Sequence, residues 1–389
     1  MITFIFAIIL LFCGYWLYGR LVERVFRPDS RPTPAVEHPD GVDYVPMKTW
    51  RIFLIQLLNI AGTGPIFGAL MGAVFGPVVF LWVVFGSILG GAVHDYMSGM
   101  ISLRMDGASI SEIVGKYLGQ GAKQIMRVFS VVLLVLVGAV FTTSPATLIA
   151  RLTPEWMNAQ FWVVVILVYY LLATLLPIDK LIGKLYPIFG GVLLIMVVGI
   201  IGGLVAGGYP LPELVIADLH PDGLPVWPFM FVTVACGAVS GFHATQSPMM
   251  ARCMKTEKDG RKVFYGAMIA ESIIALVWAA AGVAFYGTTG GLQQALAELG
   301  QSGVVYDISV SLLGVIGGVL AVIGVVVCPI SSGDTAFRSA RLTIADWFKI
   351  DQSHLPKRLA ITVPLLLVGA VLTQLNFDVI WRYFSWSNQ

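Results

Sequence analysis

The stretches Ala61-Gly62-Thr63-Gly64-Pro65 and Ser240-Gly241-Phe242-His243-Ala244-Thr245-Gln246-Ser247-Pro248 interrupt two long apolar segments of the sequence. Proline removes a backbone donor and clashes with the preceding turn, and glycine permits a helix to unwind. In hydrocarbon, unwound backbone survives only where it lines a polar cavity. Paired interruptions at matching places in two halves therefore predict two broken membrane helices around a transporter site. The alternative is that both are ordinary proline kinks.

The composition around these breaks is that of a membrane protein. Of 389 residues, 57% are hydrophobic and only 12% are charged, about half the roughly 25% expected of a soluble domain. The four cysteines, Cys13, Cys236, Cys253 and Cys328, form no C-x-x-C pair and predict neither a disulfide framework nor a zinc site. No basic stripe with interleaved aromatic residues is present, so nucleic-acid binding is not expected.

A membrane-spanning helix needs about 20 mostly apolar residues. Ten segments meet that requirement, and an eleventh begins near Phe377 and is cut by the end of the sequence. The ten predicted segments are 2–20, 52–75, 77–101, 124–149, 160–178, 185–206, 227–251, 263–286, 307–330 and 358–375. The first segment is followed by Arg20 and Arg24 and has no small-residue cleavage site, so we expect a retained helix and no signal peptide.

The distribution of lysine and arginine predicts the orientation. With the N-terminus on the outer side, 22 of the 24 basic residues fall in the inner stretches, while Arg151 falls outside and Arg382 in the last segment. We therefore expect a multi-pass membrane protein with an outer N-terminus.

The segment count also predicts an inverted repeat. Residues 1–51 would form an extra N-terminal helix and a basic linker, residues 52–206 a first repeat of five helices, and residues 227–389 a second repeat. Because five is an odd number, the second repeat would cross the membrane in the opposite direction. The half-helix ends would then present amide dipoles to an anionic substrate and carbonyls to a cation. The residues expected to bind substrate are Gly62, Thr63, Gly64, Ser240, Gly241, His243, Thr245 and Gln246.

Ionisable residues within membrane spans are costly and mark candidate functional sites. Four such residues, His94, Asp95, His243 and Glu271, are candidates for proton coupling. Neighbouring helical residues diverge by about 100°, so His94 and Asp95 are not expected to face one ligand unless the helix is distorted. The alternative is that they form a structural pair with the inner basic loops. For His243, the alternative is a structural hydrogen bond to the unwound backbone.

A second coupling mode is open at Ser331 and Ser332, which follow Cys328-Pro329 at the end of the ninth predicted segment. Their hydroxyls could hold Na⁺ against the carbonyls of the second segment. The alternative is an ordinary helix cap, since serine and aspartate favour helix ends. No cofactor is predicted.

Several motifs together resemble the carbon starvation protein A family. They are Ala61–Gly68, Gly90-Gly91-Ala92-Val93-His94-Asp95-Tyr96-Met97-Ser98-Gly99-Met100, Arg104, Gly107–Ile110, Cys328–Arg338 and Trp381–Phe384. The resemblance extends over essentially the whole chain. It implies nutrient uptake across the inner membrane in the starvation response, with peptides and pyruvate as associated substrates. It also implies the amino acid–polyamine–organocation superfamily, whose leucine-transporter-like five-plus-five inverted fold agrees with the segment count. Members of the family continue beyond Trp386–Gln389, so the second repeat is expected to be incomplete.

The leading hypothesis is therefore a symporter, not an enzyme, that alternates access around the two breaks and is coupled to protons. Its partners would be a small-molecule substrate, H⁺ or Na⁺, and the lipid bilayer, and the sequence leaves the oligomeric state open. A Na⁺-coupled carrier of the same fold is the first alternative. The second is an intramembrane metal-dependent hydrolase that uses His94, Asp95 and His243, although no H-E-x-x-H pair supports it.

Overall fold

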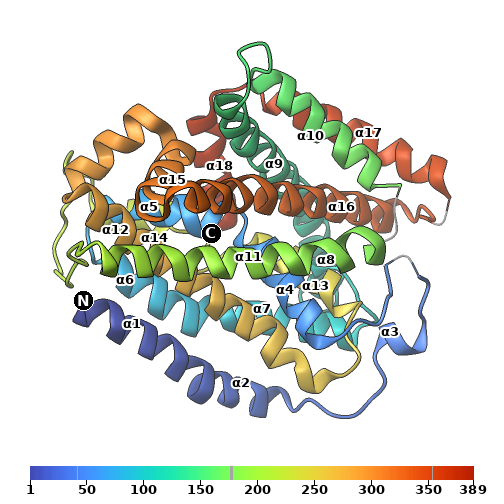
Figure 1. Cartoon of the computed structure of the whole chain (residues 1–389). Helices are drawn as coiled ribbons and strands as arrows, with labels where there is room; N and C mark the ends of the chain where they lie inside the picture. Colours follow the sequence, from blue (N-terminus) through green and yellow to red (C-terminus); the bar gives the residue numbers. More distant parts are fainter. Residues whose placement is uncertain (42, 176–177, 353) are drawn as a thin grey trace.

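The computed structural model describes residues 1–41, 43–175, 178–352 and 354–389, and all regular secondary structure in that part of the chain is helical (Figure 1). Helices are the expected outcome for such apolar segments, because a helix satisfies its backbone polar groups internally. The elements of the first half are α1 (Ile2–Cys13), η1 (Gly14–Tyr18), α2 (Gly19–Phe26), α3 (Pro34–Glu37), α4 (Thr49–Ala61), η2 (Gly64–Gly68), α5 (Ala69–Ala73), α6 (Val79–Leu81), η3 (Trp82–Gly91), α7 (Ala92–Arg104), α8 (Ile110–Leu118), α9 (Gln120–Leu152), α10 (Ala159–Ala173) and α11 (Ile178–Ala206). Those of the second half are α12 (Val226–Thr233), α13 (Phe242–Ala251), η4 (Glu257–Asp259), η5 (Arg261–Tyr265), α14 (Gly266–Tyr286), α15 (Thr289–Val322), η6 (Ile323–Val327), α16 (Cys328–Phe348), α17 (Leu355–Leu372) and α18 (Phe377–Asn388).

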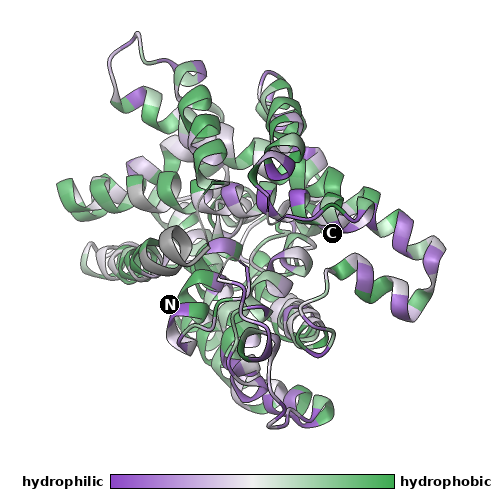
Figure 2. Ribbon diagram, turned by 90° about the vertical axis from the view of Figure 1, so that its right-hand side faces the viewer, coloured by the Kyte–Doolittle hydropathy of each residue, from purple (hydrophilic) through white to green (hydrophobic). Residues whose placement is uncertain are grey.

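Seven helices in the described residues are long and apolar enough to cross a membrane, and an eighth span is a bent pair. The seven are Ile2–Phe26, Val79–Arg104, Gln120–Leu152, Leu185–Ala206, Glu257–Tyr286, Thr289–Val322 and Leu355–Leu372. The bent pair joins Thr49–Ala61 to Gly64–Ala73 at an angle of 51°. Seen along the helices, the peripheral ones are predominantly hydrophobic, as a surface in contact with lipid requires (Figure 2). Val315 and Ile2 on that surface are 86% and 79% exposed.

Three of the ten predicted segments differ in the structure. The segment 160–178 is the shorter helix α10, and its end includes residues 176–177, which lie outside the described residues. The segment 227–251 is broken, as predicted, but at residues 234–241 between α12 and α13, and the predicted break from Phe242 to Pro248 is helical. The segment 307–330 is not one helix, because Gly314 has a φ of 60° that only glycine adopts without strain. The chain is helical again after this kink and continues through η6 and α16 to Phe348, so the motif around Ser331 and Ser332 lies inside a helix and not at its end.

Several basic residues that the sequence places on the inner side, among them Arg104, Lys123, Arg127 and Arg252, form contacts around α7, α8 and the loop before α4, and we call this region the basic end. There the Tyr44 hydroxyl donates to the Asp106 carbonyl (2.7 Å), and Arg252 Nε donates to the Gly107 carbonyl (2.9 Å). Burial alone would raise the pKa of Glu112, but hydrogen bonds from Lys123 and Arg127 hold that pKa below its ordinary value. The Tyr44 and Arg252 contacts join segments that are 62 and 145 positions apart in the sequence.

A buried carboxylate ties the N-terminal helix to the rest of the basic end. The side chain of Glu257 is fully buried and accepts two hydrogen bonds of 2.9 Å from Arg104. Arg104 also donates to the carbonyl of Arg27 (2.8 Å) and lies over the Phe26 ring. Arg31, whose side chain is 49% exposed, approaches Glu257 only to 3.6 Å. Arg104 therefore supplies most of the charge compensation for Glu257.

The variant Arg104→Met is expected to lower the free energy of unfolding by about 3 kcal/mol, because removing one partner of a buried ion pair leaves an uncompensated charge. Arg31→Met is the matched control, and its exposed ion pair predicts a loss below about 1 kcal/mol. Unfolding titrations in mixed micelles measure both values. Equal, small effects of the two variants would show that Glu257 does not depend on Arg104.

Candidate functional site

The first predicted break is present where the glycine and proline residues predict it. Helix α4 ends at Ala61, Gly62 has a φ of 28°, and the chain re-enters a helical conformation at Gly64, with Pro65 in the first turn of η2. Pro65 is tolerated there because the first turn of a helix needs no donor from its amide. This break produces the bend in the eighth span.

The second break lies directly against the first. Helix α12 ends at Thr233, and α13 begins only at Phe242. Between them Gly237 has a φ of 92°. A Cβ added to Gly64 would lie 2.2 Å from Cys236 Cβ, so the two unwound segments are in backbone-to-backbone proximity. The broken helices therefore meet at one point inside the bundle.

Asp95 and His243 form the centre of the polar network at this point. Asp95 Oδ2 lies 3.0 Å from His243 Nδ1, and Asp95 Oδ1 lies 3.0 Å from His94 Nδ1. The side chains of Asp95 and His243 are fully buried, whereas that of His94 is 33% exposed. Asp95 thus connects a buried histidine to a partly exposed one. Neighbouring helical residues diverge by about 100°. The Asp95 carboxylate nevertheless contacts both His94 and His243, because each of its two oxygens contacts a different ring.

The glycines of α7 and η3 explain how Asp95 reaches this position. Gly91, Asp95 and Gly99 are spaced by four residues and therefore lie on one face of the helix. A Cβ on Gly91 would lie 2.2 Å from the Ala238 carbonyl oxygen, and one on Gly99 would lie 2.4 Å from the Phe264 ring. Only glycine permits this close approach, which places Asp95 beside the second break.

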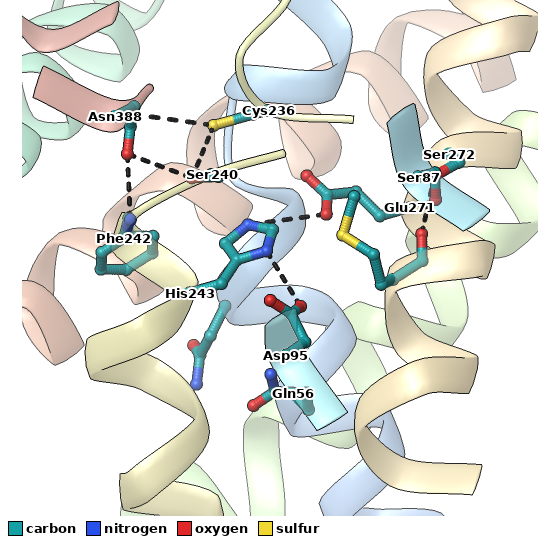
Figure 3. A network of polar contacts seen from close by, with 12 residues as sticks. Gln56, Ser87, Asp95, Cys236, Ser240, Phe242, His243, Glu271, Ser272 and Asn388 are labelled. Carbon is teal, nitrogen blue, oxygen red and sulfur yellow. Dashed lines mark hydrogen bonds and ion pairs between the residues drawn. The ribbon is translucent and has the colours of Figure 1, made fainter. Parts of the chain in front are cut away.

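Glu271 completes the network from the opposite side (Figure 3). Its Oε2 lies 3.6 Å from His243 Nε2, and both side chains are fully buried. His243 Nε2 and the carboxylate oxygens of Glu271 form no hydrogen bond of ordinary length and angle among the described residues, although the backbone of Ile60 lies near His243 and that of Gly237 near Glu271. The neighbouring Ser272 donates to Ser87 (2.5 Å), which fixes α14 against η3. All four residues predicted as proton-coupling candidates therefore lie in one chain of contacts, His94–Asp95–His243–Glu271.

The residues expected to bind substrate lie around the same point, with different degrees of hydrogen bonding. The hydroxyl of Thr63 and both polar atoms of the Gln246 amide are buried without a partner in the described part of the chain. Thr245 donates to the Phe242 carbonyl (2.8 Å), and Ser240 donates to Asn388 (3.1 Å). Gly62, Gly64 and Gly241 contribute backbone. Their role in substrate binding stays a prediction.

The Ser332 hydroxyl lies against carbonyls of the second predicted segment, as the sodium hypothesis requires, whereas the Ser331 hydroxyl does not. The Ser332 hydroxyl donates to the Asn59 carbonyl (2.8 Å) at the end of α4, and also approaches the Leu58 carbonyl (3.4 Å). Ser331 donates to the Cys328 carbonyl of its own helix (2.6 Å). The alternative that these serines cap a helix end is wrong, because both lie within a continuous helical stretch.

Two polar residues of this region had no role in the sequence-based hypothesis. Asn388 in α18 contacts the start of α13, and Gln56 in α4 donates to Ser247 in α13 (3.2 Å). Both are fully or almost fully buried polar residues in apolar segments. That property is the signal that could have identified them, as it identified Glu271.

A soft-metal site is the alternative use of this network. Sγ of Cys236, a ring nitrogen of His243 and a carboxylate oxygen of Glu271 lie within 4.8 Å of one another. A zinc-binding cysteine must be a thiolate, and the Cys236 Sγ lies 3.5 Å from the Ser240 hydroxyl. The predicted hydrolase triad is not a ligand set, since His94 and His243 contact different oxygens of Asp95 at hydrogen-bond distance. The same histidine and carboxylates can bind protons, since each of these groups is titratable.

Comparison with known proteins shows which family and which transporters this chain resembles. The family model of carbon starvation protein CstA matches residues 1–158 and 146–289. An uncharacterized membrane protein of Haemophilus influenzae is 42% identical over 349 residues, which is 76% of this chain and 94% of that protein. The peptide transporter CstA of Helicobacter pylori J99 is 29% identical over 333 residues, and the pyruvate/proton symporter BtsT of Escherichia coli K12 is 29% identical over 332 residues. Both alignments include 68% of this chain, which spans about half the length of these transporters (48% and 46%).

Solved structures show the fold. MhsT in complex with L-phenylalanine aligns with a TM-score of 0.62 at 16% identity, covering 87% of this chain and 86% of MhsT. A manganese transporter of Eremococcus coleocola aligns with a TM-score of 0.54 at 9% identity, covering 90% of this chain and 78% of that protein. The predicted leucine-transporter-like fold is thereby confirmed. The limits of the two repeats, 52–206 and 227–389, stay a prediction.

Proposed function

The chain belongs to the carbon starvation protein CstA family, and from this premise we propose that it is the core of a proton-coupled symporter for small nutrients such as peptides or pyruvate. We place it in a prokaryotic inner membrane with the N-terminus on the outer side, since this orientation puts the basic end inside. Substrate reaches the two breaks alternately from either side of the membrane. The relatives named as a peptide transporter and as a pyruvate/proton symporter support the substrate class.

One observation carries the proton coupling: His243 lies between two buried carboxylates at the point where the broken helices meet. With Asp95 and Glu271 ionised and His243 protonated, the network has a charge of −1. One additional proton makes it neutral, and a neutral network is far less costly to enclose in a medium of low dielectric. Because His243 is already protonated in this state, the proton goes to the Glu271 carboxylate, whose Oε2 lies 3.6 Å from His243 Nε2. His94, being partly exposed, is the point at which protons enter.

The substrate would lie beside this network. Within the described part of the chain, the Thr63 hydroxyl and the Gln246 amide are buried polar groups without hydrogen-bond partners, and such groups are rare unless a ligand or water completes them. The amides at the start of α13 favour a carboxylate because of the helix dipole. Binding of the proton and of the substrate would then be coupled through His243, which belongs to both sets of residues.

Uptake into proteoliposomes tests the proposal. Labelled pyruvate and labelled dialanine are supplied outside vesicles with an imposed inward proton gradient. We expect one of the two to accumulate, and a protonophore to abolish the accumulation. Failure of both to accumulate under a proton gradient and under a sodium gradient would contradict the transport function.

The variant Ser331→Ala/Ser332→Ala separates the two coupling modes. We expect proton-driven uptake to stay within about twofold of the wild-type rate, because Ser332 only contributes hydrogen bonds to carbonyls, worth about 1 kcal/mol each. Initial rates are measured with and without Na⁺. A sodium requirement in the wild type that disappears in the double variant would instead establish the sodium-coupled alternative.

A further inference from the structure

Asn388, in α18, accepts hydrogen bonds from the donors at the start of α13. Its Oδ1 accepts hydrogen bonds from the Phe242 amide (3.0 Å) and from the Ser240 hydroxyl (3.1 Å), as Figure 3 shows. Its backbone oxygen accepts a third from the Gly241 amide (2.6 Å). The residue is 1% exposed. Two oxygens of one residue thus satisfy three donors at the second break.

These donors are the ones that a substrate carboxylate would use. A carboxylate also presents two oxygens, and it carries a full negative charge that the N-terminal dipole of α13 favours. Hydrogen bonds to an ionised acceptor are roughly twice as strong as those to a neutral one. A carboxylate therefore competes well with the neutral amide of Asn388.

Unpartnered groups next to this position independently indicate a ligand. His243 follows Phe242 directly, and its Nε2 has no hydrogen-bond partner among the described residues. Gln246, one turn further along α13, has two unpartnered amide atoms. Both side chains are fully buried. Within the described residues the Gln246 amide forms no hydrogen bond, and His243 Nε2 has only the Glu271 carboxylate at 3.6 Å, whereas the three donors beside them are all satisfied by Asn388.

We propose that Asn388 is an internal substitute for the substrate carboxylate, and that substrate displaces it. This inference rests on the proposed transport function and adds a role for α18. In the empty carrier, unsatisfied amides within the membrane are unfavourable, and Asn388 satisfies them while the empty carrier reorients. When substrate binds, Asn388 is released from Ser240, Gly241 and Phe242, and α18 becomes free to move relative to α13.

The substitution Asn388→Ala separates this role from a direct contact with substrate. Removing Oδ1 removes the competitor, so the half-saturating concentration in substrate–substrate exchange is expected to fall about threefold to tenfold. Net uptake, which requires return of the empty carrier, is expected to fall about tenfold. The complementary substitution Asn388→Asp supplies a carboxylate from within, and we expect the half-saturating concentration to rise at least about tenfold.

Exchange and net uptake are measured with labelled pyruvate and labelled dialanine in proteoliposomes of the full chain. Ser387→Ala is the control, since the Ser387 hydroxyl donates only to its own helix at Tyr383 and Phe384. A raised half-saturating concentration in Asn388→Ala, or wild-type values in Asn388→Asp, would overturn the inference. Absence of exchange by the wild type with both substrates would instead overturn the proposed function, and this inference with it.

Discussion

Asp95→Asn is expected to reduce proton-driven accumulation of substrate at least about 100-fold. The substitution keeps the shape of the side chain but removes the charge that holds both histidines. Breaking a buried ion pair costs about 3–5 kcal/mol, and every 1.4 kcal/mol corresponds to a factor of ten. Because Asp95 is fully buried and contacts His243 at 3.0 Å, solvent cannot compensate for the loss.

The variant is measured by the ratio of internal to external labelled substrate at steady state, with substrate–substrate exchange as the second readout. We expect exchange to persist, because it needs no net movement of protons. Asp378→Asn is the matched control, since Asp378 lies exposed at the start of α18 and is expected to behave as wild type. Wild-type accumulation in Asp95→Asn would exclude the network from coupling.

Gly64→Ala is expected to reduce transport at least about tenfold in either direction. The added Cβ would lie 2.2 Å from Cys236 Cβ and 2.5 Å from its Sγ. Overpacking of this kind costs about 1–3 kcal/mol, and here it separates the two breaks on which alternating access depends. Initial rates of uptake and efflux in proteoliposomes measure the effect.

A compensating substitution at Cys236 tests whether its contact with the added Cβ causes the loss of transport. In Gly64→Ala/Cys236→Gly the nearest remaining atom is Cys236 Cα, at the ordinary contact distance of 3.7 Å, so transport is expected to recover at least in part. Gly202→Ala, which would contact nothing within 4 Å, is the control. If the double variant is as inactive as Gly64→Ala, then the contact between the breaks is not the reason for the defect.

The breaks and the ionisable residues could be predicted from the sequence because each violates what a membrane helix tolerates. Gly62–Pro65 cannot remain regular helix, and Asp95, His243 and Glu271 are too costly in a span unless they are paired. Their mutual contacts could not be predicted, since Asp95 and His243 are 148 positions apart. The bridging of two histidines by Asp95 depends on the close approach at Gly91 and Gly99, which a single sequence does not reveal.

The parts that the sequence misplaced depend on tertiary packing. Gly314 lies in a continuous apolar run, and nothing in that run signals the positive φ that divides it. Polar residues after Cys328 resemble a helix end, but α16 is surrounded by other helices and buries Ser332, Asp334 and Thr335. Asn388 is a polar residue near the end of an apolar segment, which marks it as a candidate, but its contacts with Ser240 and Phe242, 148 and 146 positions away, could not be predicted.

The most direct test of proton coupling is proton movement itself. Proteoliposomes that contain a pH-sensitive dye, with no imposed gradient, receive pyruvate or dialanine from outside while the membrane potential is clamped. The account predicts internal acidification that requires substrate, occurs in the wild type and is absent in Asp95→Asn. Substrate entry without acidification in the wild type, or acidification that persists in Asp95→Asn, would contradict it.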